Sequence, residues 1–434
     1  MLRDREGSSV IAPYYEDGGL QLFHGDSRIV LAADENGYDF TLGYGTERAF
    51  PDASFDSVVC DPPYELGFMG KGWDSTGIAY DVDLWREVLR VLKPGGHLLA
   101  FGASRTWHRL AAAIEDAGFE IRDSIAWLFG SGFPKSLDVA KAIDKDAGHW
   151  RGWAGAIESA NGAMSGSNYE RTGKGSPITA DAAEWEGWGT ALKPAFEPIV
   201  VGRKPLAGTV AATVLAYGTG ALNIAAARVG DEVRHAAFTS LAPASGNRLG
   251  APGTQEARRG TQGEPKEYVG RWPTNVVLDD SQAASLDEQT GVLKSGMMRA
   301  GQQKAGKAAG ILGEFKPQAT LNDTYGDAGG ASRFFPTFHY EAKAPGSERP
   351  NVDGVEHATV KPLDLMRWCV RLVTRRGGRV LDLFAGSGTT GEAALLEGMD
   401  CTLIEYEADH LPLILQRVRK PLTPSLFGDI EGIA

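Results

Sequence analysis

The stretch RVLDLFAGSGTTG, residues 379–391, decides the fold that the sequence predicts. An apolar strand signal over residues 379–384 leads into GSGTTG (386–391), which has the spacing G-x-G-x-x-G and opens a helical pattern. Glu405 follows at the end of the next predicted strand. Glycines let a ligand approach the backbone, helix N-terminal N–H groups attract polar atoms, and the acidic residue can accept ribose hydroxyl hydrogens. The stretch therefore predicts an α/β fold that binds a nucleoside-containing cofactor.

The rest of the chain supplies the strands and helices that this stretch lacks. Apolar runs alternate with helical spacing in the first 130 residues and again after residue 350. This β-α-β rhythm predicts a twisted, mostly parallel sheet with helices on both faces. The predicted strands are 20–24, 55–60, 97–101, 121–129, 196–201, 379–384 and 401–404, and the predicted helices are 82–92, 106–117, 361–374 and 390–396.

Two stretches break the rhythm. Residues 130–193 are rich in Gly, Ser, Ala and Trp, and that many aromatic residues predict an ordered insertion rather than a free linker. Between residues 207 and 350 no sustained period appears apart from 275–278, which predicts a loop-rich accessory region.

Composition limits the class of protein. Hydrophobic residues make up 42% of the 434 and charged residues 23%, as in folded globular proteins. No run of 18 apolar residues and no signal peptide is found, so we expect a cytoplasmic protein without a membrane partner. The three cysteines are too few for a disulfide framework, and the dispersed histidines predict no metal site.

A second polar turn, Asp61-Pro62-Pro63-Tyr64, directly follows the predicted strand over residues 55–60. Proline lacks an N–H and restricts φ, so the turn presents the Pro62 carbonyl beside the Asp61 carboxylate. Two acceptors facing one point suit an –NH₂ group. The flat ring of Tyr64 suits stacking on a planar base, a contact worth about 1 to 3 kcal/mol. The turn therefore predicts a site for an amino group on a heterocyclic base.

The two turns together resemble one family. Residues 61–64 resemble motif IV, and residues 382–391 resemble motif I, of the S-adenosylmethionine-dependent DNA amino-methyltransferases. HATVKP (357–362) resembles the segment leading into the motif X helix, with Ala358 at a position where proline is usual. His24-Gly25-Asp26-Ser27 resembles the strand end that contacts the cofactor adenine. The order, with the catalytic motif first, resembles the permuted β group.

The resemblance implies a Rossmann-like methyltransferase fold of the α/β class. Its twisted, mostly parallel sheet has seven strands, its motif order is circularly permuted, and a loop-rich target-recognition region is inserted. The implied division is a catalytic half at 1–207 with a Trp-rich insertion at about 131–192, a target-recognition region at 208–350, and a cofactor-binding half at 351–434.

The resemblance also implies the chemistry. S-adenosyl-L-methionine is the expected cofactor, and double-stranded DNA with a flipped-out target base is the expected substrate. The expected catalytic residues are Asp61, Pro62, Pro63 and Tyr64. The expected cofactor-binding residues are Asp26, Asp61, Lys361, Pro362, Asp382, Phe384, Ala385, Gly386, Ser387, Gly388, Thr389 and Glu405.

Several alternatives differ in the residues that they need. The Asp-Pro-Pro-Tyr form favours adenine N6 over cytosine N4 as the target. A 5-carbon cytosine enzyme would need a Pro-Cys nucleophile, and no cysteine follows a proline. An NAD-dependent dehydrogenase would place its glycine motif early in the chain, whereas here that motif comes late. RNA and protein methyltransferases usually keep the cofactor motif first, so the order of the motifs disfavours them. An inactive DNA-binding subunit would be expected to lose one motif, and both are present.

DNA contacts are expected in the middle of the chain. The net charge of −12 opposes nonspecific binding to phosphates, so the basic residues that bind DNA must be concentrated. Residues 290–310 carry four cations and no acidic residue: Lys294, Arg299, Lys304 and Lys307. We assign these to phosphates. A homodimer and a cognate restriction endonuclease stay open as further partners.

Overall fold

The computed structural model describes residues 12–32, 50–67, 72–130, 132, 136–149, 176–236, 266–294, 296, 299, 326–338, 349–357 and 359–419. The chain divides into two compact units. The larger unit comprises Met1–Gly130 with Phe196–Ala434, and the smaller comprises Ser131–Ala195. The predicted division at residues 207 and 350 stays a prediction.

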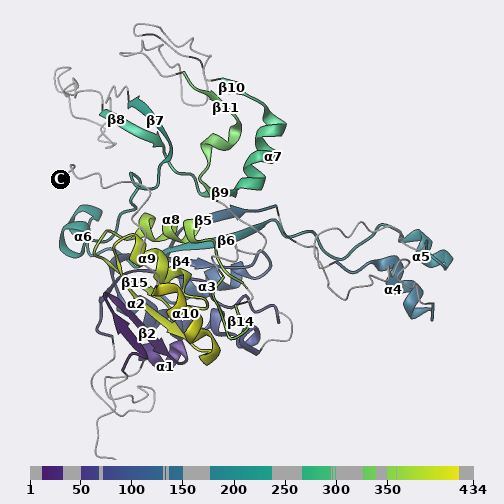
Figure 1. The fold of residues 1–434 in the computed structure, drawn as a ribbon, viewed down its shortest axis with the longest axis horizontal. Helices are drawn as coiled ribbons and strands as arrows, with labels where there is room; N and C mark the ends of the chain where they lie inside the picture. Colours follow the sequence, from purple (N-terminus) through teal and green to yellow (C-terminus); the bar gives the residue numbers. More distant parts are fainter. Residues whose placement is uncertain are drawn as a thin grey trace, which may run out of the picture. The chain divides into compact units, whose positions relative to one another are not determined.

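A ten-stranded sheet forms the centre of the larger unit (Figure 1), in the order β1-β2-β16-β15-β3-β4-β6-β5-β9-β12. The five strands from β2 to β4 in this order run parallel to one another, whereas β6 is antiparallel to both β4 and β5. The bounds are β2 Leu20–His24, β16 Asp400–Glu405, β15 Arg379–Asp382, β3 Phe55–Cys60, β4 Leu92–Phe101, β6 Phe196–Arg203 and β5 Glu120–Leu128.

The α/β fold class predicted from the sequence is confirmed, but seven strands is too low a number. On one edge β1 (Tyr15–Asp17) pairs with β2 in an antiparallel hairpin. Beyond β5, β9 (Val276–Asp279) and β12 (Thr337–Phe338) add two short parallel strands. These last two come from the region predicted to be loop-rich, where only residues 275–278 carried a strand signal.

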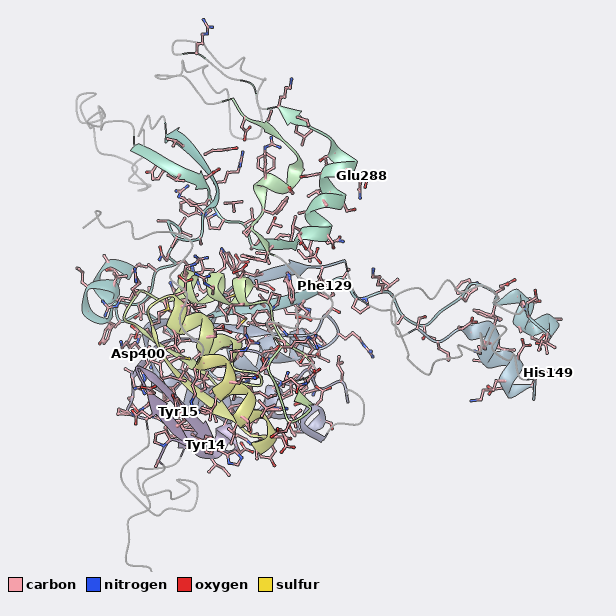
Figure 2. All side chains as sticks on the ribbon, viewed as in Figure 1. Tyr14, Tyr15, Phe129, His149, Glu288 and Asp400 are labelled. Atoms are coloured by element: carbon pink, nitrogen blue, oxygen red, sulfur yellow. The ribbon has the colours of Figure 1, made fainter. Side chains whose placement is uncertain are left out.

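Two hydrophobic clusters cover the two faces of the sheet. Along β3, Val59 belongs to one cluster while Val58 and Cys60 belong to the other, as expected for alternating side chains. Each fully buried large side chain contributes about 1.5 to 3 kcal/mol to the free energy of folding. Figure 2 shows side chains crowding between the sheet and its helices. The first cluster includes α8 (Leu363–Val373), α9 (Thr389–Leu396) and α10 (Leu411–Val418), and the second includes α1 (Ser27–Ala32), α2 (Val82–Val91) and α3 (Trp107–Asp116).

The accessory region contains helices that the sequence pattern did not predict. α6 (Val210–Tyr217) is almost entirely apolar, and α7 (Asp280–Thr290) has no apolar stripe, so neither shows helical periodicity. Their caps were the available signals, because Thr209 and Asp279 each accept a backbone N–H from the first turn. The other elements here are β7 Val229–Ala236, β8 Lys266–Arg271, β10 Leu293–Lys294, β11 Ala328–Gly329 and η6 Ala331–Phe334.

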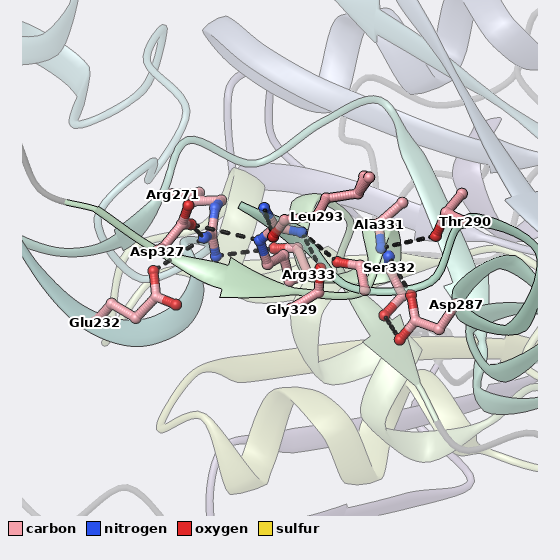
Figure 3. A network of polar contacts seen from close by, with 11 residues as sticks. Glu232, Arg271, Asp287, Thr290, Leu293, Asp327, Gly329, Ala331, Ser332 and Arg333 are labelled. Atoms are coloured by element: carbon pink, nitrogen blue, oxygen red, sulfur yellow. Dashed lines mark hydrogen bonds and ion pairs between the residues drawn. The ribbon is translucent and has the colours of Figure 1, made fainter. Parts of the chain in front are cut away.

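A polar network holds this accessory region together (Figure 3). Arg271 on β8 forms ion pairs with Asp327 and, at 2.9 Å, with Glu232 of β7. Asp287 of α7 accepts hydrogen bonds from the backbone N–H and the hydroxyl of Ser332, both at 2.7 Å. Because every member has partners within the network, its role is to join α7, β8 and η6.

The described part of the smaller unit includes two helices and a pair of tryptophans. The buried carboxylate of Asp144 on α4 (Val139–Asp146) accepts the N–H of Thr179 at 2.9 Å and its hydroxyl at 2.8 Å, just before α5 (Ala180–Glu184). The rings of Trp185 and Trp188 meet edge to face at 5.1 Å. Trp150 and Trp153 lie outside the described residues.

Candidate active site at the carboxyl edge of the sheet

Four neighbouring strands end in acidic residues at one edge of the sheet. Asp26 follows β2, Glu405 ends β16, Asp382 ends β15 and Asp61 follows β3. Because these strands are parallel, their carboxyl ends meet at the same edge, which is where ligands of open α/β sheets bind. The Gly25 N–H donates to the Glu405 carbonyl at 2.9 Å. The structure therefore brings together residues from opposite ends of the chain.

The three glycines of residues 386–391 have separate structural reasons. Gly386 and Gly388 have φ values of +53° and +79°, in the left-handed region that favours glycine. A Cβ on Gly391 would lie 2.8 Å from Leu403 Cδ1, so this glycine lets α9 pack closely on β16. The loop is thus a tight strand-to-helix turn, as its spacing predicted.

Glu405 already makes three hydrogen bonds within the protein. Its Oε2 accepts the Gly386 N–H at 2.6 Å, and its Oε1 accepts the Glu407 N–H at 2.9 Å. His410 Nδ1 lies 3.1 Å from the same Oε1. Glu405 therefore fixes the glycine turn, and ribose hydroxyls would share its oxygens with these groups.

The two acidic residues beside Glu405 differ in their charge state. Burial raises the pKa of Asp382 to about 7, although its hydrogen bonds with Thr390 and the Phe384 N–H oppose the shift. The side-chain hydrogen bond from Arg28 lowers the pKa of Asp26. Asp26 is therefore held ionised, whereas Asp382 titrates near neutral pH.

Side chains outside the turn that begins with Asp61 hold it in place by hydrogen bonds. Asp74 Oδ1 accepts the Glu65 N–H at 2.9 Å and its Oδ2 accepts the Leu66 N–H at 3.2 Å. The Thr106 hydroxyl donates to the Tyr64 carbonyl at 3.0 Å. These bonds fix the Asp-Pro-Pro-Tyr turn before any substrate binds.

A compact charged cluster surrounds the Asp61 carboxylate. Lys361, which precedes α8, places Nζ 2.6 Å from Asp61 Oδ2 and 3.1 Å from the Tyr64 hydroxyl. Burial opposes the charge of Lys361, but Asp61 and Glu197 overcome this and raise its pKa above the usual value. Asp61 Oδ1 is buried and has no hydrogen-bond partner within the described part of the chain. The cluster therefore presents one unsatisfied acceptor, which is costly unless a ligand supplies a donor.

The sequence did not single out Glu197, Asp74 or His410. Glu197 is the second residue of the mostly apolar strand β6. A carboxylate at the start of such a strand was the one sequence feature that could have indicated a functional role for it. Asp74 lies nine positions from Glu65 and His410 five positions from Glu405, but no motif in the sequence indicated either contact. Lys361 was expected at the cofactor, and the structure places it against Asp61.

The four residues expected to bind DNA are only partly described. Lys294 lies on the short strand β10, and it and Arg299 are exposed. Lys304 and Lys307 lie outside the described residues.

The described residues contain neither a metal cluster nor a membrane span. No group of three or more His, Cys, Asp and Glu side chains there is arranged to hold a metal ion. Likewise, no helix in that part of the chain is long and apolar enough to cross a membrane.

The fold is of the α/β class with acidic residues at the carboxyl edge of its sheet, and comparison with known proteins adds a family similarity. Residues 257–416 match the family model of the N6/N4 DNA methylases. This match agrees with the resemblance to the DNA amino-methyltransferases that the sequence motifs predicted. The matched segment includes Lys361, the glycine turn and Glu405, whereas Asp61 lies outside it.

Solved structures give further similarities at low identity. A putative DNA modification methylase from Thermus thermophilus is 16% identical, with 93% of this chain and 95% of that chain covered and a TM-score of 0.37. The same methylase in complex with S-adenosyl-L-methionine is 17% identical, with 92% and 96% covered and a TM-score of 0.35. The PvuII DNA methyltransferase, described as cytosine-N4-specific, is 13% identical, with 94% and 88% covered and a TM-score of 0.42. No curated protein matched the chain.

Proposed function

We propose that the protein transfers a methyl group from S-adenosylmethionine to the N6 amino group of a flipped-out adenine in double-stranded DNA. The observation that carries this proposal is the buried oxygen Asp61 Oδ1, which has no partner among the described residues at an edge with three further acidic residues. An amino group donates hydrogen bonds, and a buried carboxylate oxygen without a donor is the acceptor that it needs.

The residues at the edge suit S-adenosylmethionine. A Cβ on Gly386 would lie 3.1 Å from His357 Nε2, and one on Gly388 would lie 3.1 Å from Ile414 Cγ2, so glycine lets these side chains pack closely on the turn. The acidic residues Asp26, Asp382 and Glu405 suit a cationic ligand. When bound, S-adenosylmethionine would supply a methyl group on a sulfonium. Transfer would form a bond between the amine nitrogen and the methyl carbon and break the carbon–sulfur bond, with S-adenosylhomocysteine as the leaving group and one proton lost from the nitrogen to water.

The same charges oppose a dinucleotide cofactor. NAD carries a pyrophosphate, and anion sites need unpaired N–H groups or cations. Here Glu405 already accepts the Gly386 N–H, and Lys361, which precedes α8 at this edge, is engaged by Asp61. This arrangement favours methyl transfer over the dehydrogenase alternative.

The proposed chemistry assigns a task to each residue of the Asp61 turn. Asp61 Oδ1 and the Pro62 carbonyl accept hydrogen bonds from the target amine, which orients its nitrogen and stabilises the positive charge that develops. Tyr64 stacks on the extruded base and replaces part of its lost stacking. Since the Tyr64 hydroxyl donates to Glu197 at 3.0 Å, the ring is already held in one orientation. The enzyme acts by positioning, and no covalent nucleophile is required.

The test is the identity of the methylated base. The chain is expressed in a host that lacks DNA methylation, and its DNA is hydrolysed and analysed by mass spectrometry. We expect N6-methyladenine. N4-methylcytosine would instead assign the second substrate of the family, and the absence of both from the DNA of cells containing folded protein would refute the proposal.

The proposal places part of the DNA contact at Lys294 and Arg299. Removing one cation that neutralises a phosphate should lower the slope of log K against log salt by about 0.9, so replacing both residues with Ala should flatten it by about 2 units. Adding Lys304→Ala and Lys307→Ala should bring the change to about 3 to 4 units. Parent slope and affinity in the quadruple variant would place the DNA surface elsewhere.

A further inference from the structure

A second carboxylate lies behind Asp61, and the Asp-Pro-Pro-Tyr turn does not include it. Glu197 is the second residue of β6, the strand that lies between β4 and β5 in the sheet. Its Oε2 accepts the Tyr64 hydroxyl at 3.0 Å and lies 3.4 Å from Lys361 Nζ. Lys361 also contacts Asp61 Oδ2 at 2.6 Å. Glu197 is thus linked to Asp61 through both Lys361 and Tyr64.

The charges of this cluster explain why a second carboxylate is useful. The ammonium of Lys361 binds Oδ2 of Asp61 and leaves Oδ1 without a partner among the described residues, but alone it would cancel the charge that the amine needs. With Glu197 ionised, two carboxylates share one ammonium and the cluster keeps one net negative charge. Methyl transfer puts positive charge on the amine nitrogen, and a preorganised negative charge in a dry site stabilises it.

Burial makes the negative charge of Glu197 energetically costly, and the neighbouring Lys361 offsets part of this cost. Burial raises the pKa of Glu197, while the ammonium of Lys361 lowers it and the carboxylate of Asp61 raises it. The Tyr64 hydroxyl donates to the ionised form. A buried acidic residue with no role would be less costly as an apolar or amide side chain.

We propose that Glu197 is a positioning residue for methyl transfer: it shares Lys361 with Asp61 and fixes Tyr64, so that Asp61 Oδ1 stays available and the cluster stays negative. This inference rests on the proposed function and assigns a residue that the sequence motifs do not contain.

The test compares Glu197→Gln with the parent in the full chain. The amide keeps the shape and an acceptor for Tyr64 but removes the charge. We expect the transfer rate at saturating cofactor and DNA to fall about tenfold or more, with cofactor affinity within about threefold of the parent; tenfold corresponds to about 1.4 kcal/mol in the barrier. Glu197→Asp restores the charge and should recover part of the rate. Glu120→Gln is the matched control, since Glu120 lies on the adjacent strand β5 and pairs with Arg203 at 2.5 Å.

A pH profile separates the charge effect from a structural one. The titratable groups facing Glu197 are Asp61, Tyr64 and Lys361. Protonating Glu197 in the parent should reproduce the defect of Glu197→Gln, so the parent rate should fall toward the variant rate as the pH decreases. The ratio of the two rates should therefore shrink in acid.

The outcomes separate this inference from the proposed function. A parent enzyme that methylates DNA and a Glu197→Gln variant with the parent rate would overturn the role of Glu197 alone. A parent that binds S-adenosylmethionine but methylates no DNA would overturn the proposed function. If Glu197→Gln does not fold, Tyr64→Phe decides. This variant removes the hydroxyl that donates to Glu197 and accepts from Lys361, and a rate equal to that of the parent would contradict the inference.

Discussion

Asp26 and Glu405 form one end of the acidic edge and Asp61 the other, and the carboxylates of Glu405 and Asp61 are used differently. At one end both oxygens of Glu405 accept hydrogen bonds from the protein itself, from Gly386, Glu407 and His410. At the other end Asp61 has one oxygen held by Lys361 and the other without a partner among the described residues. Similar acidic residues at the ends of parallel strands therefore have different tasks.

In the proposed function, this difference lets one sheet edge separate binding from catalysis. Glu405 holds the Gly386 turn, to which the proposal assigns the cofactor, so its interactions are present before and during the reaction. Asp61 keeps an acceptor for a group that arrives with the substrate, and an interaction made only there raises the rate of the chemical step. Variants at the two ends should therefore separate affinity from turnover.

The largest effect is expected for Asp61→Ala. Losing a preorganised electrostatic group in an active site lowers turnover by about 10²- to 10³-fold. Steady-state transfer of a radiolabelled methyl group should show this loss, while calorimetry should find cofactor affinity within a few-fold of the parent. Parent turnover in the variant would remove Asp61 from the catalytic role.

The next effect concerns Asp382, which lies between the two ends on β15. Its pKa is raised from 3.8 to about 7, mainly by burial, so the folded state prefers the protonated form. This stabilisation is present below about pH 4 and is lost as the pH rises to about 7. Asp382→Asn avoids the loss and should be more stable than the parent at pH 8 by at least about 1.4 kcal/mol, the equivalent of one pKa unit.

Chemical denaturation at pH 4 and pH 8 measures the Asp382 effect. The two proteins should have similar stability at the lower pH and differ at the higher one. An advantage of the asparagine variant that is equal at both pH values would mean that ionisation of Asp382 is not its cause.

A smaller effect is expected for Glu405→Ala. Without this carboxylate the glycine turn loses its anchor and the cofactor loses an acceptor, so cofactor affinity should fall about tenfold, or about 1.4 kcal/mol. The rate at saturating cofactor should change little. Calorimetry with S-adenosylmethionine measures the affinity, and an unchanged dissociation constant would contradict the assignment.

The smallest effect is expected for His410→Ala. This change removes one of the three hydrogen bonds to Glu405 and leaves both backbone bonds in place. Cofactor affinity should change by only about a few-fold, within the roughly 0.5 to 1.5 kcal/mol of one hydrogen bond. A loss as large as that of Glu405→Ala would show that His410 itself holds the cofactor.

The sequence predicted the parts of this edge that depend on local pattern. The strands β2 and β3 have the predicted bounds, because short apolar runs closed by turn residues are strong signals. The tight turn at residues 386–391 and the position of Asp61 followed from spacing in the same way. Parallel pairing then brings the strand ends together.

The sequence could not predict contacts between residues that are far apart in the chain, or helices whose apolar residues do not recur at helical spacing. Lys361 lies 300 positions from Asp61, and its ion pair appears only when the two halves of the sheet join. Glu197 has no motif around it and acquires its partners from two other segments. α6 and α7 have no amphipathic pattern, so only their capping residues indicated them.

The central claim is tested most directly by single-turnover methyl transfer with Asp61→Ala and Glu405→Ala. Each variant is saturated with S-adenosylmethionine and mixed with DNA at a concentration below that of the enzyme. Saturation removes differences in cofactor affinity, so the observed rate reports the chemical step. We predict that Asp61→Ala transfers at least about 100-fold more slowly than the parent, whereas Glu405→Ala stays within a few-fold of it. Equal losses in the two variants, or a larger loss for Glu405→Ala, would contradict the division of the edge into a binding end and a catalytic end.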